Sequence, residues 1–278
     1  MNFIDRIGHA ERSNHSLLCI GLDPDPARFP DPWANDASRI FDFCRAIVDA
    51  TRDLAIAFKP QIAYFAARRA EDQLERLIAH IHAVAPNVPV ILDAKRGDIG
   101  STAQQYAVEA FERYQADALT LSPFMGLDSI EPYFDYPDKG LFLLCRTSNP
   151  GGSDLQGQAL ANGEALFEHI ARLAQTRWNR HQQLGLVVGA TFPAELTRVR
   201  ELAPDLPLLI PGIGAQGGDA EATVRCAWRA HAGRTIAPIL VNSSRAILYA
   251  SQGADFAAAA RRAALDAREV LNRSRHAR

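Results

Sequence analysis

The feature that most constrains the fold of this 278-residue chain is a series of eight short apolar runs, mostly separated by helical stretches. Short apolar runs are typical of strands buried in a parallel sheet. They cover residues 16–22, 54–58, 90–92, 118–121, 141–145, 186–188, 208–210 and 239–241. Between the first two runs, apolar residues recur at helical spacing at Phe41, Cys44, Ile47 and Val48, which predicts a helix there.

Eight strands that alternate with helices indicate an α/β protein, and specifically a (β/α)8 TIM barrel. The length fits one such barrel, so we expect a single domain that spans residues 1–278. An open, doubly wound sheet is the alternative, but no G-x-G-x-x-G follows the first strand. The alanine-rich stretch 253–278 predicts a helix that packs in the outer ring.

Composition argues against several classes of function. A formal net charge of −2 gives no basic surface, so we expect no nucleic-acid partner. The N-terminal segment is charged throughout, and nowhere do eighteen apolar residues run together, so we expect no membrane contact and a cytoplasmic protein. With no C-x-x-C pair, the cysteines are expected to be buried thiols in a reducing compartment. They are Cys19, Cys44, Cys145 and Cys226.

One charged stretch, VILDAKRGDIGSTAQQ, combines two carboxylates with a lysine. An apolar strand leads into it, and side chains alternate along a strand, so Asp93 and Lys95 are predicted to share one face. A glycine then allows a turn that holds Asp98. Ser101 and Gln104 have the capping-box spacing that begins a helix. The predicted unit is a strand, a charged turn and a helix.

A cluster of charges at a strand end is often only a solvated set of ion pairs. Here the run before Asp93 is apolar, so its carboxylate is expected at the end of a core strand, where an unpaired charge is costly. Lys95 is its nearest partner in sequence. Two carboxylates flanking Lys95 in a partly buried pocket would hold it protonated and available for proton transfer.

The residues that follow the strands of such a barrel gather at one mouth, where active sites lie. Taken alone, a polar residue at a strand end is more often a cap or a loop residue than a catalyst. Nine of them at the same end of eight strands favour a site. They are Asp23, Lys59, Asp93, Lys95, Ser122, Ser148, Thr191, Gln216 and Arg245.

Two loops after these strands are rich in glycine or in small polar residues. Residues 147–164 follow the fifth strand, and residues 211–221 follow the seventh. Segments of this kind can close over a ligand and offer backbone N–H groups to an anion, although plain surface loops have the same composition.

The pattern Asp93-x-Lys95-x-x-Asp98-Ile99 resembles the signature of the orotidine 5'-monophosphate decarboxylases, and the flanking segments are similar to the longer, type 2 branch found in bacteria. A lone D-x-K-x-x-D would be a weak signal, but five further segments match in the family's order. They are IGLDPDP at 20–26, AFKPQIAYF at 57–65, CRTSNPGG at 145–152, PGIGAQGG at 211–218 and NSSRAI at 242–247.

The resemblance implies decarboxylation of orotidine 5'-monophosphate (OMP) to uridine 5'-monophosphate (UMP) and CO2 in pyrimidine biosynthesis, with no metal or organic cofactor. It implies a charged network of Lys59, Asp93, Lys95 and Asp98, in which Lys95 is the proton donor. It also implies a homodimer with shared active sites, because Asp98 and Thr102 would cross to the other subunit's site.

The resemblance further implies contacts with the substrate. Arg245 would bind the phosphate through its planar, multi-donor head, and Gln216 would close over the same phosphate. Ser148 would hydrogen-bond the pyrimidine edge. Asp23 together with Lys59 would hold the ribose hydroxyls.

Two other functions stay open at this point. One is a related phosphate-binding barrel that uses Mg²⁺ to decarboxylate or aldol-cleave a sugar phosphate, with Asp93 as a metal ligand. Lys59 stands where that chemistry would need an acidic ligand, and CRTSNPGG matches the pyrimidine loop, so both features count against it. The other is a non-catalytic nucleotide-binding barrel, which gives no reason for the complete Lys-Asp-Lys-Asp set.

Overall fold

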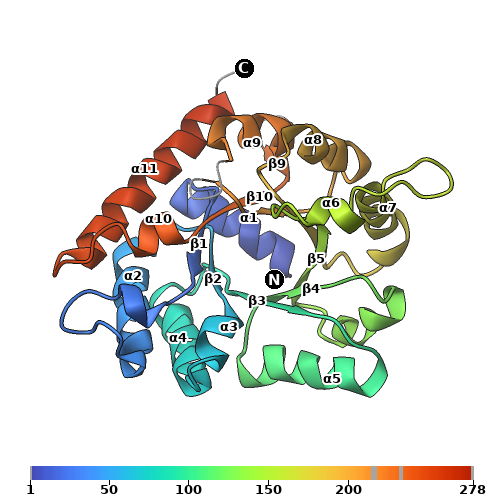
Figure 1. Cartoon of the computed structure of the whole chain (residues 1–278). Helices are drawn as coiled ribbons and strands as arrows, with labels where there is room; N and C mark the ends of the chain where they lie inside the picture. Colours follow the sequence, from blue (N-terminus) through green and yellow to red (C-terminus); the bar gives the residue numbers. More distant parts are fainter. Residues whose placement is uncertain (1, 214–217, 232–233, 277–278) are drawn as a thin grey trace.

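The computed structural model describes residues 2–213, 218–231 and 234–276, and Figure 1 shows a ring of strands surrounded by helices. Eight parallel strands form one sheet, in the order β2-β1-β10-β7-β6-β5-β4-β3. Parallel bridges from Phe58 to Val90 and from Gln61 to Asp93 join the two ends of this sheet. The predicted (β/α)8 barrel is therefore confirmed.

Each barrel strand overlaps one of the apolar runs in the sequence. The strands are β1 (Leu18–Leu22), β2 (Ala57–Pro60), β3 (Ile91–Arg96), β4 (Ala118–Leu121), β5 (Gly140–Arg146), β6 (Leu184–Val188), β7 (Leu208–Ile210) and β10 (Ile239–Ser243). The largest shift of a strand start is in β2, which begins three residues after the start of its predicted run. The largest shift of a strand end is in β3, which ends four residues after its run. Residues at the start of the β2 run are buried ahead of the strand, so burial alone could not mark where pairing begins.

Helices cover the outer face of the barrel, as Figure 1 shows. They are α2 (Ile40–Thr51), α4 (Glu71–Val84), α5 (Gly100–Val108), α7 (Leu166–Leu173), α8 (Pro193–Leu202), α9 (Ala220–Ala227) and α11 (Phe256–His276). The shorter helices α3 (Ile62–Ala66), α6 (Gly152–Leu155) and α10 (Arg245–Leu248) follow β2, β5 and β10. Because α11 packs against α2 and α9, the outer-ring helix predicted for 253–278 is confirmed from Phe256 to His276, while residues 253–255 form a turn before it.

Two connections depart from regular alternation. The chain between β4 and β5, all of which is described, contains two short 3-10 turns, Leu127–Ser129 and Glu131–Asp135, in place of an α-helix. Before β10, the antiparallel strands β8 (Arg229–His231) and β9 (Arg234–Ala237) form a separate pair that the sequence pattern did not indicate.

Helix α1 (Phe3–Asn14) closes the amino-terminal end of the barrel, and it crosses the centre of Figure 1. Its residues Phe3 and Ile7 pack into the cluster of side chains inside the barrel. The Phe3 ring meets Phe142 edge to face, with centroids 5.8 Å apart. Gly140 makes this packing feasible, because a Cβ there would lie 2.1 Å from the Phe3 ring. Side chains of α1 therefore fill the amino-terminal end of the barrel.

Three of the four cysteines are buried, and burial raises the pKa of Cys19 to about 12. The prediction of burial is wrong for Cys226, which is partly exposed on α9 next to the buried Ala227. Among the helices of the described residues, none combines the length and apolar character that crossing a membrane requires.

Candidate active site

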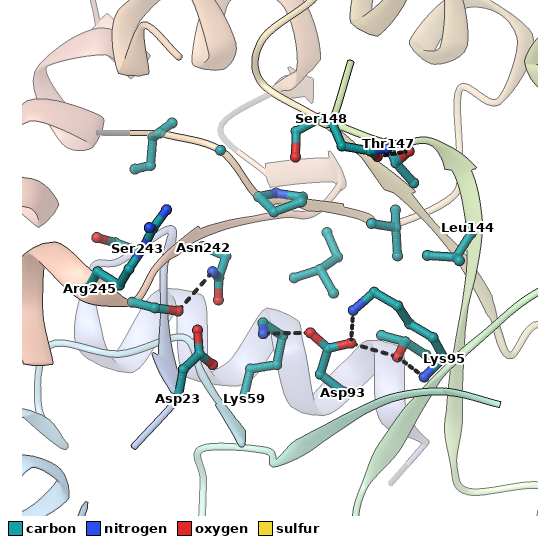
Figure 2. Close-up of a pocket in the computed structure, with 18 of the residues that line it drawn as sticks. Asp23, Lys59, Asp93, Lys95, Leu144, Thr147, Ser148, Asn242, Ser243 and Arg245 are labelled. Atoms are coloured by element: carbon teal, nitrogen blue, oxygen red, sulfur yellow. Dashed lines mark hydrogen bonds and ion pairs between the residues drawn. The ribbon is translucent and has the colours of Figure 1, made fainter. Parts of the chain in front are cut away.

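A cavity of about 500 Å³ opens at the carboxyl ends of the barrel strands. Its apolar wall includes Val187 and Leu209, which also belong to the cluster packed on α1. Six of the nine polar residues predicted at the mouth line it, and Figure 2 shows them converging from different strands. These six are Asp23, Lys59, Asp93, Lys95, Ser148 and Arg245.

Asp93 is the centre of a compact charged network (Figure 2). Its Oδ2 accepts a hydrogen bond from Nζ of Lys59 at 2.8 Å. Its Oδ1 accepts one from Nζ of Lys95 at 2.6 Å and one from Oγ1 of Thr120 at 2.9 Å. Asp93 and Lys59 are buried, whereas the side chain of Lys95 is 46% exposed. Lys95 is therefore the cation of this network that a ligand in the cavity could reach most readily.

The charges in this network stabilise one another against the effect of burial. Burial alone would raise the pKa of Asp93, but the charges of Lys59 and Lys95, and their hydrogen bonds, hold that pKa well below its usual range. Burial alone would lower the pKa of Lys59, but the charges of Asp93 and Asp23 hold it above its usual value. Asp93 is thus ionised and Lys59 protonated throughout the neutral pH range.

The end of β3 is irregular at the point where Lys95 enters the cavity. Oγ1 of Thr120 accepts the backbone N–H groups of both Ala94 and Lys95, at 3.1 and 3.0 Å, and the register with β4 shifts there. Lys95 has a φ of 48°, which is uncommon for a residue with a side chain. The predicted contact between Asp93 and Lys95 is confirmed, but simple strand alternation is the wrong reason for it.

Asp98 and Thr102 do not join this network within their own chain. Asp98 is half-buried and its Oδ1 accepts the N–H of Ile99 at 2.9 Å, while Thr102 is exposed. Neither residue lines the cavity. The predicted capping box is wrong, because α5 begins at Gly100 without a side-chain cap and Ser101 already lies in its first turn.

Three other residues predicted at the mouth have different outcomes. Thr191 supports Ser148 and does not line the cavity, since its Oγ1 donates to the backbone oxygen of Ser148 at 3.2 Å. Ser122 donates its N–H to the backbone oxygen of Arg96 and is also absent from the lining. Gln216 lies outside the described residues. The mouth therefore contains both residues that face a ligand and residues that hold those in place.

The loop after β5 is fixed by a buried arginine that sequence reasoning missed. Arg146 donates from Nη2 to Oγ of Ser153 at 3.0 Å, pairs with Glu195, and stacks over the ring of Phe192 at 4.0 Å. Oε1 of Gln156 accepts the N–H of Thr147 at 2.8 Å. These contacts tie the start of the predicted 147–164 loop to the first turn of α8.

Sequence reasoning also missed several residues that line the cavity. Thr120 had a visible signal, since it is the one polar residue in the run 118–121. Gln156 lies in the predicted 147–164 loop, and the other five lie in segments matched only as motifs. These residues are Thr120, Thr147, Asn149, Gln156, Asn242, Ser243 and Ser244.

On one side of the cavity lies Arg245, the first residue of α10, and on the other lies Lys95 (Figure 2). The Arg245 side chain is exposed to the mouth. A ligand that carries an anionic group at one end and a reactive centre at the other could therefore span the cavity.

Comparisons with known proteins agree with this geometry. A family model described as "Orotidine 5'-phosphate decarboxylase / HUMPS family" matches residues 16–263. Proteins named orotidine 5'-phosphate decarboxylase from Polaromonas naphthalenivorans and Methylibium petroleiphilum are 71% and 70% identical to this chain over 278 residues. These alignments cover 99% of this chain and 97% and 100% of the two relatives.

Two solved structures from Leishmania donovani have the same fold. An OMP decarboxylase is 38% identical, with a TM-score of 0.85 and full coverage of both chains. A UMP synthase is 40% identical, with a TM-score of 0.86, and the match covers 99% of this chain and 56% of that one. The barrel and the charged network agree with these matches, which show that the chain belongs to the orotidine 5'-phosphate decarboxylase / HUMPS family.

Proposed function

We propose that this protein decarboxylates OMP to UMP and CO2 without a cofactor, and that it acts in pyrimidine biosynthesis. The observation that carries the proposal is the placement of Asp93 between two lysines at the wall of a cavity. The names of the 70–71% identical relatives support the choice of substrate. The assignment to the longer, type 2 branch stays a prediction.

Lys95 is the proton donor in this proposal. Loss of CO2 from an unsaturated ring carbon leaves a carbanion that the ring does not delocalise, so the site must stabilise negative charge as it develops. An ammonium group at about 4 Å, with an effective dielectric near 20, is worth on the order of 4 kcal/mol, or roughly three decades of rate. The rest of the acceleration must come from binding energy in remote groups of the substrate.

The remote groups would be the phosphate, the ribose and the pyrimidine edge. We assign the phosphate to Arg245, whose planar head can form two parallel hydrogen bonds, with Gln216 closing over it. Asp23 and Lys59 contact the ribose, and Ser148 contacts the pyrimidine. The tie between Arg146 and Ser153 would keep the chain around Ser148 in place while the substrate binds.

A Mg²⁺-dependent reaction on a sugar phosphate fits this site less well. Both oxygens of Asp93 are already bonded to donors, and two of these donors are lysine ammonium groups. A divalent cation at Asp93 would have to displace them and would be repelled by their charge. A barrel that only binds nucleotides would have no use for this arrangement of charges.

We also propose that the active unit is a homodimer in which Asp98 and Thr102 reach the partner's site. In support, Asp98 does not line the cavity of its own chain, and large apolar side chains close to it in sequence are exposed. Ile99, Phe124 and Met125 are 53%, 74% and 43% exposed, and they follow the carboxyl ends of the neighbouring strands β3 and β4. A second copy of the chain would cover them. The single domain over residues 1–278 and the cytoplasmic location remain proposals.

The decisive test of the reaction is turnover in the absence of metal. Purified protein treated with EDTA is mixed with OMP, and the loss of ultraviolet absorbance is followed. We expect turnover that chelation does not reduce and that added Mg²⁺ does not increase. Activity lost on dialysis against EDTA and restored by Mg²⁺ would favour the sugar-phosphate enzyme, and no turnover at all would favour the nucleotide-binding barrel.

The dimer is tested by mixing two inactive variants, Lys95→Ala and Asp98→Ala. If sites are shared, a heterodimer has one site with both lesions and one site with neither, so up to about half of the native activity per heterodimer should return. After statistical exchange, roughly a quarter of the total activity should return. No recovery after demonstrated subunit exchange would mean that Asp98 acts within its own chain or that the protein works as a monomer.

A further inference from the structure

Two buried oxygen atoms at the cavity have no hydrogen-bond partner among the described residues: Oδ1 of Asp23 and Oδ1 of Asn242. The side chain of Asn242 is well buried, since the residue is only 8% exposed. A buried acceptor without a donor has lost its hydrogen bonds to water without replacement, so native proteins keep few of them. Two such acceptors in one ligand cavity indicate that a ligand supplies the donors.

Neighbouring residues fix the orientation of the Asn242 side-chain amide. Its Nδ2 donates to Oγ of Ser244 at 3.4 Å, so its oxygen is turned away from Ser244 and toward the side of the cavity that carries Asp23 (Figure 2). Gly21, on the adjacent strand β1, leaves room for this arrangement. A Cβ at Gly21 would lie 1.8 Å from Oγ of Ser244 and 3.2 Å from Oδ1 of Asn242.

The order of residues along the cavity indicates which part of a ligand would meet these oxygens. In Figure 2, Asn242 and Asp23 lie between Arg245 on one side and Lys59, Asp93 and Lys95 on the other. A nucleotide with its phosphate at Arg245 and its reacting ring at Lys95 therefore places its sugar beside Asn242 and Asp23. The ribose of such a nucleotide has two free hydroxyl groups, and each can donate a hydrogen bond to one of the two unpaired oxygens.

We propose that Asn242 binds the substrate directly, by accepting a hydrogen bond from one ribose hydroxyl while Asp23 accepts one from the other. Asn242 would then help to select ribonucleotides over deoxyribonucleotides, because a missing hydroxyl leaves a buried acceptor unpaired. The inference rests on the proposed function, since it takes the ligand to be a nucleoside 5'-monophosphate.

A 180° rotation of the amide provides the competing arrangement. Ser244 would then donate to Oδ1, and Nδ2 would face Asp23, which would leave no polar atom of Asn242 for a ligand. In that case Asn242 would hold Asp23 in place and would make no contact of its own with the sugar. The two arrangements differ in what happens when one hydroxyl is removed from the ligand.

The test measures binding of UMP, 2'-deoxy-UMP and 3'-deoxy-UMP by titration calorimetry. The proteins are the wild type and Asn242→Leu, with Asn242→Ala as a second variant in case the larger side chain impairs folding. Gln183→Leu is the matched control, because Gln183 is an equally buried amide just before β6, at the closed end of the barrel. Thermal unfolding of each variant reports on folding.

For the wild type, we expect each deoxy analogue to bind about tenfold more weakly than UMP. In the Asn242 variants, UMP should bind about tenfold more weakly, while the analogue that lacks the contacted hydroxyl should change less than about twofold. In the Asn242 variants, the dissociation constant of that analogue divided by that of UMP thus falls toward one. In Gln183→Leu, this ratio should stay as in the wild type for both analogues.

The proposal is overturned if both Asn242 variants keep the wild-type ratios of analogue to UMP dissociation constants, even if they bind UMP more weakly. It is equally overturned if the ratio that falls toward one in the Asn242 variants also falls toward one in Gln183→Leu. Failure of the proposed function would be seen elsewhere, as an absence of OMP turnover by the wild-type protein. Turnover by the wild type with unchanged ratios in the variants would refute only the role of Asn242.

Discussion

Two buried aspartates at neighbouring strands, Asp93 and Asp117, both pair with cations, but only Asp93 lines the cavity. Asp93 lies in the middle of β3, and Asp117 directly precedes β4. They are 7% and 3% exposed. Asp117 pairs with Arg6 through Oδ1, and its Oδ2 accepts from Nε2 of His82 at 3.0 Å and from the N–H of Val90 at 2.8 Å. Each carboxylate thus has donors on both oxygens.

Both carboxyl groups also have lowered pKa values. Burial would raise the pKa of Asp117, but the hydrogen bond from His82, the charge of Arg6 and the N–H of Val90 hold it below its usual range. A buried ion pair with a lowered pKa is therefore no mark of catalysis. What distinguishes Asp93 is the cavity beside it, and a cation, Lys95, that is 46% exposed.

The largest effect should come from Lys95→Ala, which removes the exposed cation that pairs with Asp93. We expect kcat/KM for OMP to fall at least about 1000-fold, because a charge pair of this kind is worth on the order of 4 kcal/mol. Arg6→Ala removes the corresponding cation from Asp117 and should leave kcat/KM within about threefold, while it lowers the free energy of unfolding. Equal losses of activity in the two variants would mean that Asp93 and Asp117 do not differ in their importance for catalysis.

The next largest effect should come from Arg245→Ala, which tests whether binding of the phosphate helps to stabilise the transition state beside Asp93. Loss of a charge-assisted contact with the phosphate should reduce kcat/KM by roughly 100-fold, and soluble guanidinium should partly restore it. The control is Arg261→Ala, which breaks an exposed ion pair between α11 and Asp53 in the turn after α2. Wild-type kcat/KM in Arg245→Ala would mean that another residue binds the phosphate.

A smaller effect is expected for Thr120→Val, which removes hydrogen bonds that hold Asp93 and Lys95 in position and leaves the charges of both residues in place. The variant removes the hydroxyl that donates to Asp93 and accepts the N–H groups of Ala94 and Lys95. We expect kcat to fall about tenfold with KM nearly unchanged. Thr51→Val removes a buried hydroxyl bonded to the oxygen of Ile47, and it should not alter kcat. An unchanged kcat in Thr120→Val would show that the irregular end of β3 needs no such support.

The smallest effect concerns stability in acid. The folded pKa of Asp117 is lower than its unfolded pKa of about 3.9, so its contribution to stability is present above that pH and is lost as the pH falls through the folded pKa. Urea unfolding between about pH 2 and pH 6 should therefore show a smaller loss of stability in Asp117→Asn than in the wild type. Parallel curves for the two proteins would mean that Asp117 gains nothing from its partners.

The barrel was predictable because strands buried on both faces are apolar along their whole length, as in 118–121 and 208–210. The shared mouth followed from the closure of the sheet, which brings Asp23, Lys59 and Arg245 together. What could not be predicted depends on contacts between distant segments. The bend at Lys95 depends on the Thr120 hydroxyl of the next strand, and the role of α1 as a plug depends on the space that the barrel encloses.

Contacts between distant segments also decide the roles of site residues that follow neighbouring strands. Thr191 and Ser148 both follow strands, and only the three-dimensional arrangement shows that one supports the other. Asn242 lies in a matched motif, but its unpaired oxygen is visible only once Ser244 and Gly21 are placed around it. Position along the chain thus predicts which end of the barrel a residue occupies, and its neighbours decide what it does there.

The central claim is that, of two similar buried aspartates, only Asp93 serves catalysis, and one paired measurement tests it most directly. OMP turnover and urea unfolding are measured together for Asp93→Asn and Asp117→Asn. Because each change leaves buried partners uncompensated, both variants should lose roughly 3 kcal/mol of stability. Turnover per folded molecule should fall at least about 1000-fold in Asp93→Asn and stay within about threefold in Asp117→Asn. Comparable turnover in the two variants, whether retained or lost, would contradict the claim.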